Sequence, residues 1–89
     1  MKAFVTVMGP DRIGIIAEVT TLLCSYRVNV LDISQTVMQG TFTMTMLVDT
    51  AEATEPFDTL RDALLKKGEQ MRLSIRIQRE DIFDAMHQI

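Results

Sequence analysis

The alternation of hydrophobic and polar residues predicts elements in the order strand, helix, strand, strand, helix, strand. Residues 3–8 are apolar on both faces of an extended chain, which is typical of a strand covered on both sides. Gly9-Pro10 is expected to stop this strand. Asp11 then suits the N-cap of a helix, because apolar residues recur at helical spacing from here to about Tyr26.

The middle of the chain has the pattern of a β-hairpin. Residues 28–38 place apolar side chains such as Leu31 and Ile33 at odd positions among polar ones, which predicts a half-buried strand. Gln39-Gly40 suits a tight turn. Residues 41–48 then alternate between large apolar side chains and threonines, so the two strands are expected to pair antiparallel.

The last third of the chain predicts a second helix and a final strand. Thr54 can cap the helix, with Pro56 in its tolerant first turn, and Gly68 is expected to end it. Residues 71–78 alternate again and predict a half-exposed strand. Residues 80–89 combine an acidic first turn with apolar positions at helical spacing, which predicts a short amphipathic C-terminal helix.

This βαββαβ order predicts an α+β fold, the ferredoxin-like two-layer sandwich with both helices on one face of an antiparallel sheet. Right-handed crossovers place the first and third strands in its centre. We expect one domain over residues 1–79, and a C-terminal helix at 80–89 that packs on that domain or on a dimer partner. The other sheet face combines Phe4 and Leu47 with threonines, which is apolar enough to predict association.

The composition restricts the function classes. The 89 residues are 47% hydrophobic and 24% charged, as in a folded globular chain. Cys24 is the single cysteine, which excludes an internal disulfide and a cysteine cluster. The net charge of −3 has the wrong sign for nucleic-acid binding, and an RNA-recognition module needs more aromatic residues on its central strands. We therefore expect no direct nucleic-acid partner.

The sequence also bears on location. The first residues carry one lysine and a short apolar run, a pattern that does not predict a signal peptide. No apolar run reaches membrane-spanning length. We expect a cytoplasmic protein without a membrane partner.

Residues 9–15 (Gly-Pro-Asp-Arg-Ile-Gly-Ile) carry the clearest indication of binding chemistry. Their glycines allow close approach to the N-terminus of the first helix, where free amides suit a carboxylate. The spacing differs from that of a dinucleotide fingerprint or a P-loop. His87 lacks a neighbouring nucleophile motif, and the methionines lack a His or Cys cluster, so we expect no enzyme activity, no metal and no cofactor.

Three segments, residues 5–15, 28–36 and 77–87, together resemble the ACT domain, a small regulatory module of amino-acid metabolism. The chain is most similar to the stand-alone, uncharacterised bacterial and archaeal ACT proteins, which are related to the ACT domains of the glycine cleavage system repressor. The resemblance implies a non-catalytic homodimer. It also implies an amino acid or similar small ligand at the subunit interface, between the first loop of one chain and the start of strand two of the other.

The candidate ligand site combines both arguments. The amides of Ile13, Gly14 and Ile15 at the helix N-terminus can take a carboxylate, and the Asp11 side chain can accept from an ammonium group. Asn29 matches the position from which ACT relatives reach across the dimer. The alternative is that Asp11 only caps the helix and Asn29 only turns the chain.

Two residues depart from the family pattern. Ile13 stands where most ACT domains have proline, and Arg27 stands where most have glycine. A left-handed Arg27 costs roughly 1 kcal/mol. Ligand geometry at this corner therefore need not follow that of relatives.

Other functions stay open. One is an adaptor without a ligand of its own, which pairs with another ACT-bearing regulator, including a transcription regulator, or with a metabolic enzyme. A less favoured one is a small acylphosphatase-like enzyme, because Arg12 and Asn29 only loosely imitate its arginine and asparagine.

Overall fold

A computed structural model describes residues 1–81 and shows the predicted element order. The elements are β1 (Lys2–Pro10), α1 (Ile15–Ser25), β2 (Asn29–Met38), β3 (Thr41–Asp49), α2 (Phe57–Met71) and β4 (Ser74–Arg79). The C-terminal helix expected at residues 80–89 falls almost entirely outside the described residues.

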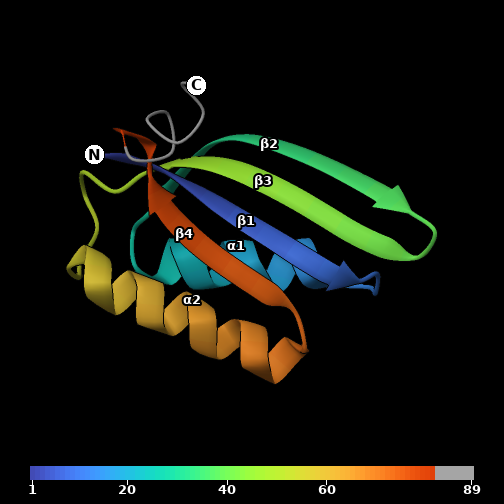
Figure 1. The fold of residues 1–89 in the computed structure, drawn as a ribbon. Coiled ribbons are helices and arrows are strands. Elements are labelled where there is room, and N and C mark those ends of the chain that lie inside the picture. Colours follow the sequence, from blue (N-terminus) through green and yellow to red (C-terminus); the bar gives the residue numbers. More distant parts are fainter. Residues whose placement is uncertain (82–89) are drawn as a thin grey trace.

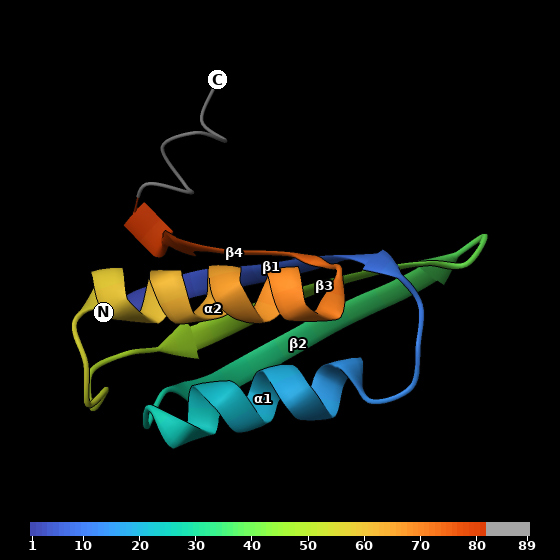
Figure 2. The same cartoon turned by 90° about the horizontal axis from the view of Figure 1, so that it is seen from below.

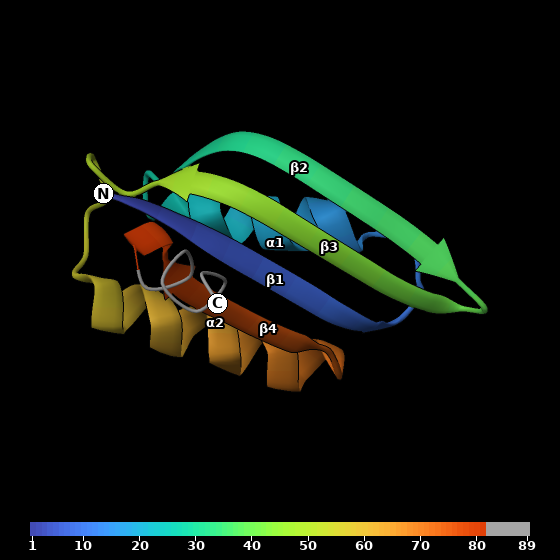
Figure 3. The ribbon, with the colours of Figure 1, turned by 45° about the horizontal axis from the view of Figure 1, so that its top comes forward.

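The strands form a four-stranded sheet in the order β2-β3-β1-β4, with antiparallel pairing throughout. Figure 1 shows β1 and β3 in the centre of this sheet, and Figure 3 shows α1 and α2 together behind it. The predicted ferredoxin-like α+β sandwich is therefore confirmed, including the central position of the first and third strands.

The core lies between the sheet and the two helices. Alternate residues of the central strands face the helices and are buried, and they pair directly across the sheet, as with Val5 and Met46 or Val7 and Met44. Complete burial of one such side chain contributes about 1.5–3 kcal/mol. The intervening positions, Phe4 and Leu47 among them, lie opposite each other on the open face, as the alternation predicts.

The start of α1 differs from the prediction. β1 continues through Gly9 to Pro10, which pairs with Thr41, and the Asp11 amide donates to the carbonyl of Gly40 at 2.8 Å. The N-cap is Gly14, in a left-handed conformation with φ 92° and without a side-chain cap. The expectation that Asp11 caps the helix is therefore wrong, because pairing with β3 extends the strand past the glycine and proline.

The start of α2 also lacks the predicted cap. Pro56 is the N-cap and no side chain bonds the first-turn amides. The Thr54 hydroxyl instead donates to the carbonyl of Tyr26 at 3.4 Å, and the Thr54 amide donates to the same oxygen at 3.0 Å. Thr54 therefore ties the segment before α2 to the end of α1.

The end of α2 lies beyond the predicted glycine. The helix passes through Gly68 to Met71, and Arg72 terminates it in a left-handed conformation with φ 58°. Gly68 is buried against the chain that follows, where the Leu73 amide donates to its carbonyl at 2.8 Å. Its lack of a side chain permits this close packing, so the expected role as a terminator is wrong.

β2 is an exposed edge strand. Its apolar side chains Ile33 and Val37 are 40% and 54% exposed, and a register shift between Val30 and Asp32 interrupts its pairing with β3. Figure 2 shows the β2–β3 hairpin extending past the helices. The expectation of a half-buried strand is therefore wrong for the single chain, because the helix layer does not cover this edge.

Candidate ligand-binding site

A pocket lies between the β1–α1 loop, the first turn of α1 and the second half of β2. Its volume is about 500 Å³. Residues that line it include Asp11, Arg12, Gly14, Ile15, Gln35, Val37 and Phe42. We call it the loop pocket. It combines a helix N-terminus, the charged residues Asp11 and Arg12, the polar residues Gln35 and Thr36, and apolar walls.

The loop pocket contains three of the five predicted site residues. Asp11, Gly14 and Ile15 line it. Ile13 does not line it, and its side chain is fully exposed. Asn29 lies at the opposite end of β2, where it pairs with Asp49.

The free amides of α1 begin one residue later than predicted. The first helical hydrogen bond runs from the Glu18 amide to the Gly14 carbonyl at 2.9 Å. The amides that a helix leaves without a helical partner are therefore those of Gly14 to Ala17, so Ile13 is not among them. The positive end of the helix dipole points into the region of the loop pocket.

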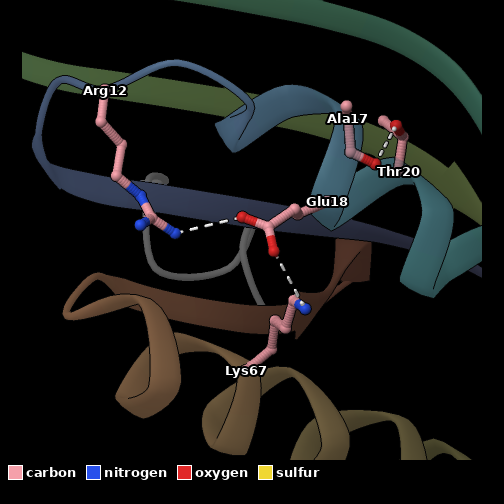
Figure 4. Close-up of polar contacts among 5 residues, drawn as sticks. All are labelled: Arg12, Ala17, Glu18, Thr20 and Lys67. Atoms are coloured by element: carbon pink, nitrogen blue, oxygen red, sulfur yellow. Dashed lines mark hydrogen bonds and ion pairs between the residues drawn. The ribbon is translucent and has the colours of Figure 1, made fainter.

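Charged side chains hold the β1–α1 loop against the helices (Figure 4). The Arg12 guanidinium Nη2 lies 3.1 Å from Glu18 Oε2, and Lys67 Nζ on α2 lies 3.5 Å from Glu18 Oε1. Arg12 and Glu18 are each nearly half exposed, so each pair contributes at most about 1 kcal/mol. Their effect is positional, because they direct the Arg12 guanidinium toward Glu18 and α2, although Arg12 still lines the loop pocket beside Asp11.

Asn29 belongs to a second cavity at the start of β2, with a volume of about 540 Å³. Arg27, Asp49 and Glu52 also line it, and Arg27 Nη2 lies 3.8 Å from Glu52 Oε2. Arg27 is left-handed with φ 60°, so the chain reverses here without a glycine. We call this cavity the β2-start pocket.

Asp49 is the acid of the β2-start pocket whose ionisation is clearly perturbed. The backbone amide of Ala51 donates to Asp49 Oδ1 at 2.9 Å and lowers the pKa of this carboxyl. Partial burial opposes that shift, and the N-terminal ammonium, 3.6 Å away, adds to it. Asp49 is therefore engaged in local contacts that fix the chain terminus.

The two pockets are too far apart to share one ligand within a chain. On β2 the β2-start pocket is lined by Asn29 and the loop pocket by residues 35–37, a separation of about 20–25 Å at the rise of an extended chain. Asp11 and Asn29 therefore meet only if a second chain supplies one of them.

Gln35 is a pocket residue that the sequence analysis missed. It faces Met44 across the sheet and so lies on the helix-facing side of β2, where it lines the loop pocket. The available signal was its polarity at an odd position between Ile33 and Val37, which are apolar.

Neither helix in residues 1–81 is long and apolar enough to cross a membrane. The same residues contain no group of three or more potential metal-ligating side chains. His87 lies outside the described residues.

Comparisons with known proteins agree with one another. A family model described as ACT domain matches residues 3–78. A UPF0237 protein of Listeria innocua is 45% identical over 89 residues, which cover all of both chains. A solved structure, an ACT domain protein from Streptococcus pneumoniae, superposes with a TM-score of 0.82 at 37% identity and covers 93% of each chain. A protein assigned as a glycine cleavage system transcriptional repressor has a TM-score of 0.73 at 25% identity, over 86% of this chain and 44% of that one.

Proposed function

The chain belongs to the ACT domain family, and from this premise we propose that it is a non-catalytic regulatory module that binds an amino acid as a homodimer. The loop pocket is the observation that supports this function most directly. It presents the free amides of Gly14 to Ala17 beside the carboxylate of Asp11. The amides suit the α-carboxylate of an amino acid, and Asp11 suits its ammonium group.

The exposed edge of β2 supports the homodimer. Among residues 1–81 no strand pairs with its outer side, and its side chains Ile33 and Val37 are left open to water. An apolar edge of this kind favours pairing with another strand. A second copy of β2, antiparallel to the first, covers both edges at once with two-fold symmetry.

This pairing also accounts for Asn29 as a site residue. If the two β2 strands pair about their midpoints, position 29 of one chain faces position 38 of the other. The partner's Asn29 then lies opposite Met38, one position along the strand from Val37 of the loop pocket, and its carboxamide can both donate and accept. In this pairing the start of β2 in one chain lies next to the loop-pocket end of β2 in the other.

The arrangement weighs against the acylphosphatase-like alternative. Arg12 is paired with Glu18 and directed toward α2, whereas Asn29 lies at the far end of β2. The two residues that loosely imitate the arginine and asparagine of that enzyme class do not converge within a chain.

Calorimetry with the twenty amino acids tests the proposal, combined with light scattering to measure the mass. We expect a dimer that binds at least one amino acid, with binding lost in both Asp11→Ala and Asn29→Ala. Asp62→Ala is the matched control, because Asp62 is an exposed acid on α2 away from the loop pocket. Binding that is unchanged in both site variants, or the absence of binding by any amino acid, would contradict the proposal.

A second candidate is an adaptor without a ligand, which uses the β2 edge to pair with a different ACT-bearing protein. The likeness to the protein assigned as a transcriptional repressor favours it, as does the apolar β2 edge, which is open to any strand of matching pattern. A monomer in solution that binds no amino acid but forms a one-to-one complex with such a protein would favour this function over the first.

A further inference from the structure

Gln35 interrupts the apolar side of β2. The β2 residues on the helix-facing side of the sheet include Ile33, Gln35 and Val37, which pair with Met46, Met44 and Phe42 of β3. The three β3 residues are buried in the core. The glutamine at the middle position therefore lies on the helix side of the sheet, exposed at its edge.

Protection of the edge strand does not explain this glutamine. A strand that avoids aggregation through polarity places charges along its edge, whereas β2 keeps Ile33 and Val37 exposed on either side of Gln35. Within residues 1–81, the carboxamide of Gln35 also forms none of the side-chain hydrogen bonds. No hydrogen bond within the described fold therefore requires its polarity.

The position of Gln35 in the loop pocket gives that polarity a role. Ile15, Val37 and Phe42 form apolar walls, and Asp11 lies at the loop end. Gln35 is two residues further from the hairpin than Val37, about 7 Å along the strand. A ligand held by its α-amino and α-carboxylate groups at Asp11 and the α1 amides extends its side chain toward Gln35.

We infer that Gln35 is a specificity-determining residue and selects amino acids whose side chains carry a hydroxyl or carboxamide over apolar ones of the same size. This inference rests on the proposed function of the loop pocket. A carboxamide donates and accepts, so it matches a hydroxyl or a second carboxamide. An apolar side chain at the same place leaves the Gln35 carboxamide without a partner and binds more weakly.

Isosteric ligand pairs provide the test: threonine against valine, and asparagine against leucine. We expect the wild-type dimer to bind the polar member of at least one pair about 3- to 10-fold more tightly, the effect of one hydrogen bond in a partly open site. Gln35→Met keeps the length of the side chain and removes both polar groups. We expect it to abolish or invert the preference.

The matched control is Gln78→Met, an exposed glutamine on the other edge strand, β4, and on the open face of the sheet. It keeps the wild-type preference. Melting curves and light scattering on each variant establish that fold and dimer are retained. Gln35→Glu, which replaces the amide donors with a charged acceptor oxygen, is a second probe of the same contact.

The outcomes separate the two proposals. Binding of amino acids with the same polar-to-apolar ratio in wild type, Gln35→Met and Gln35→Glu overturns the role of Gln35 and leaves the proposed function standing. A wild-type protein that binds no amino acid at all overturns both.

Discussion

A methyl group placed on the α-carbon of Gly68 would lie 2.7 Å from the carbonyl oxygen of Leu73. Gly68 is on α2 and Leu73 is in the short connection to β4, so the glycine sets how closely this helix lies against the chain that enters the sheet. The neighbouring atom is backbone, and it cannot move without disturbing the start of β4.

We therefore expect Gly68→Ala to lower the free energy of unfolding. The overpacking costs about 1–3 kcal/mol, which exceeds the gain of about 1 kcal/mol from the higher helix propensity of alanine. Urea denaturation measures the difference. Gln70→Ala, an exposed position on the same helix, is the control and stays within about 0.5 kcal/mol of wild type.

Arg27→Gly is expected to stabilise the protein. Arg27 has φ 60°, a conformation that costs a side-chain-bearing residue about 1–2 kcal/mol and a glycine nothing. The ion pair lost with Glu52 joins atoms 3.8 Å apart on two exposed side chains and contributes little. Glycine also gives the unfolded chain more conformational entropy, which offsets part of the relieved strain. The net gain in the free energy of unfolding is therefore up to about 1 kcal/mol.

Arg72→Gly tests the same argument at a second place, because Arg72 has φ 58° at the end of α2. We expect a gain of the same sign. Arg61→Gly, in the interior of α2, is the control. It should lower the free energy of unfolding by about 1 kcal/mol, because glycine is unfavourable inside a helix. A loss of stability in both Arg27→Gly and Arg72→Gly would contradict the strain argument.

Asp49 should give the protein an acid-dependent contribution to stability. The Ala51 amide lowers the pKa of this carboxyl below its ordinary value of 3.8, so the folded state favours the ionised form. A lowered folded-state pKa contributes stability above the unfolded pKa and loses it as the pH falls through the folded pKa. Asp49→Asn should therefore melt below wild type near neutral pH, and the difference should vanish in acid.

Thermal melts of both proteins between about pH 7 and pH 2 measure this effect. Asp62→Asn, an exposed acid on α2, is the reference for a general change in net charge. A constant difference between wild type and Asp49→Asn over the whole range would show that the ionisation of Asp49 is not coupled to folding.

The sequence was sufficient for the parts of the fold that depend on local pattern. The alternation of Phe42 and Met44 with threonines predicted which face of β3 is buried, and Gln39-Gly40 predicted the turn, where both residues adopt positive φ. Such patterns follow from the two-residue period of a strand and from the chemistry of tight turns.

The errors concern features that depend on distant parts of the chain. Asp11 was expected to cap α1, but pairing between Pro10 and Thr41 extends β1 and moves the helix start to Ile15. Gly68 was expected to end α2, but its role is contact with Leu73. Local propensity does not contain either contact.

The same distinction between local and distant contacts applies to the candidate site. The loop glycine and Asp11 were found because their chemistry lies in one short segment. Gln35 was missed because only the register with Met44 shows that it faces the helices and the loop pocket. In the proposed dimer, Asn29 joins the site only through a second chain, a relation that spacing within one sequence cannot reveal.

Ile33→Lys is expected to convert the proposed dimer to a monomer. Ile33 is 40% exposed near the midpoint of β2, so in the paired arrangement it lies close to its own symmetry mate. Two lysines brought together at this place repel each other, and charges on an edge strand oppose strand addition. In the single chain the lysine reaches water, so the loss of intrinsic stability is small. Light scattering measures the mass, which should fall from twice 10.1 kDa to 10.1 kDa, whereas Gln78→Lys on the edge strand β4 should keep the mass of wild type.

Amino-acid binding should disappear with the dimer in Ile33→Lys, because the partner's Asn29 is then withdrawn from the loop pocket. A monomer that still binds with wild-type affinity would show that the loop pocket is complete within one chain.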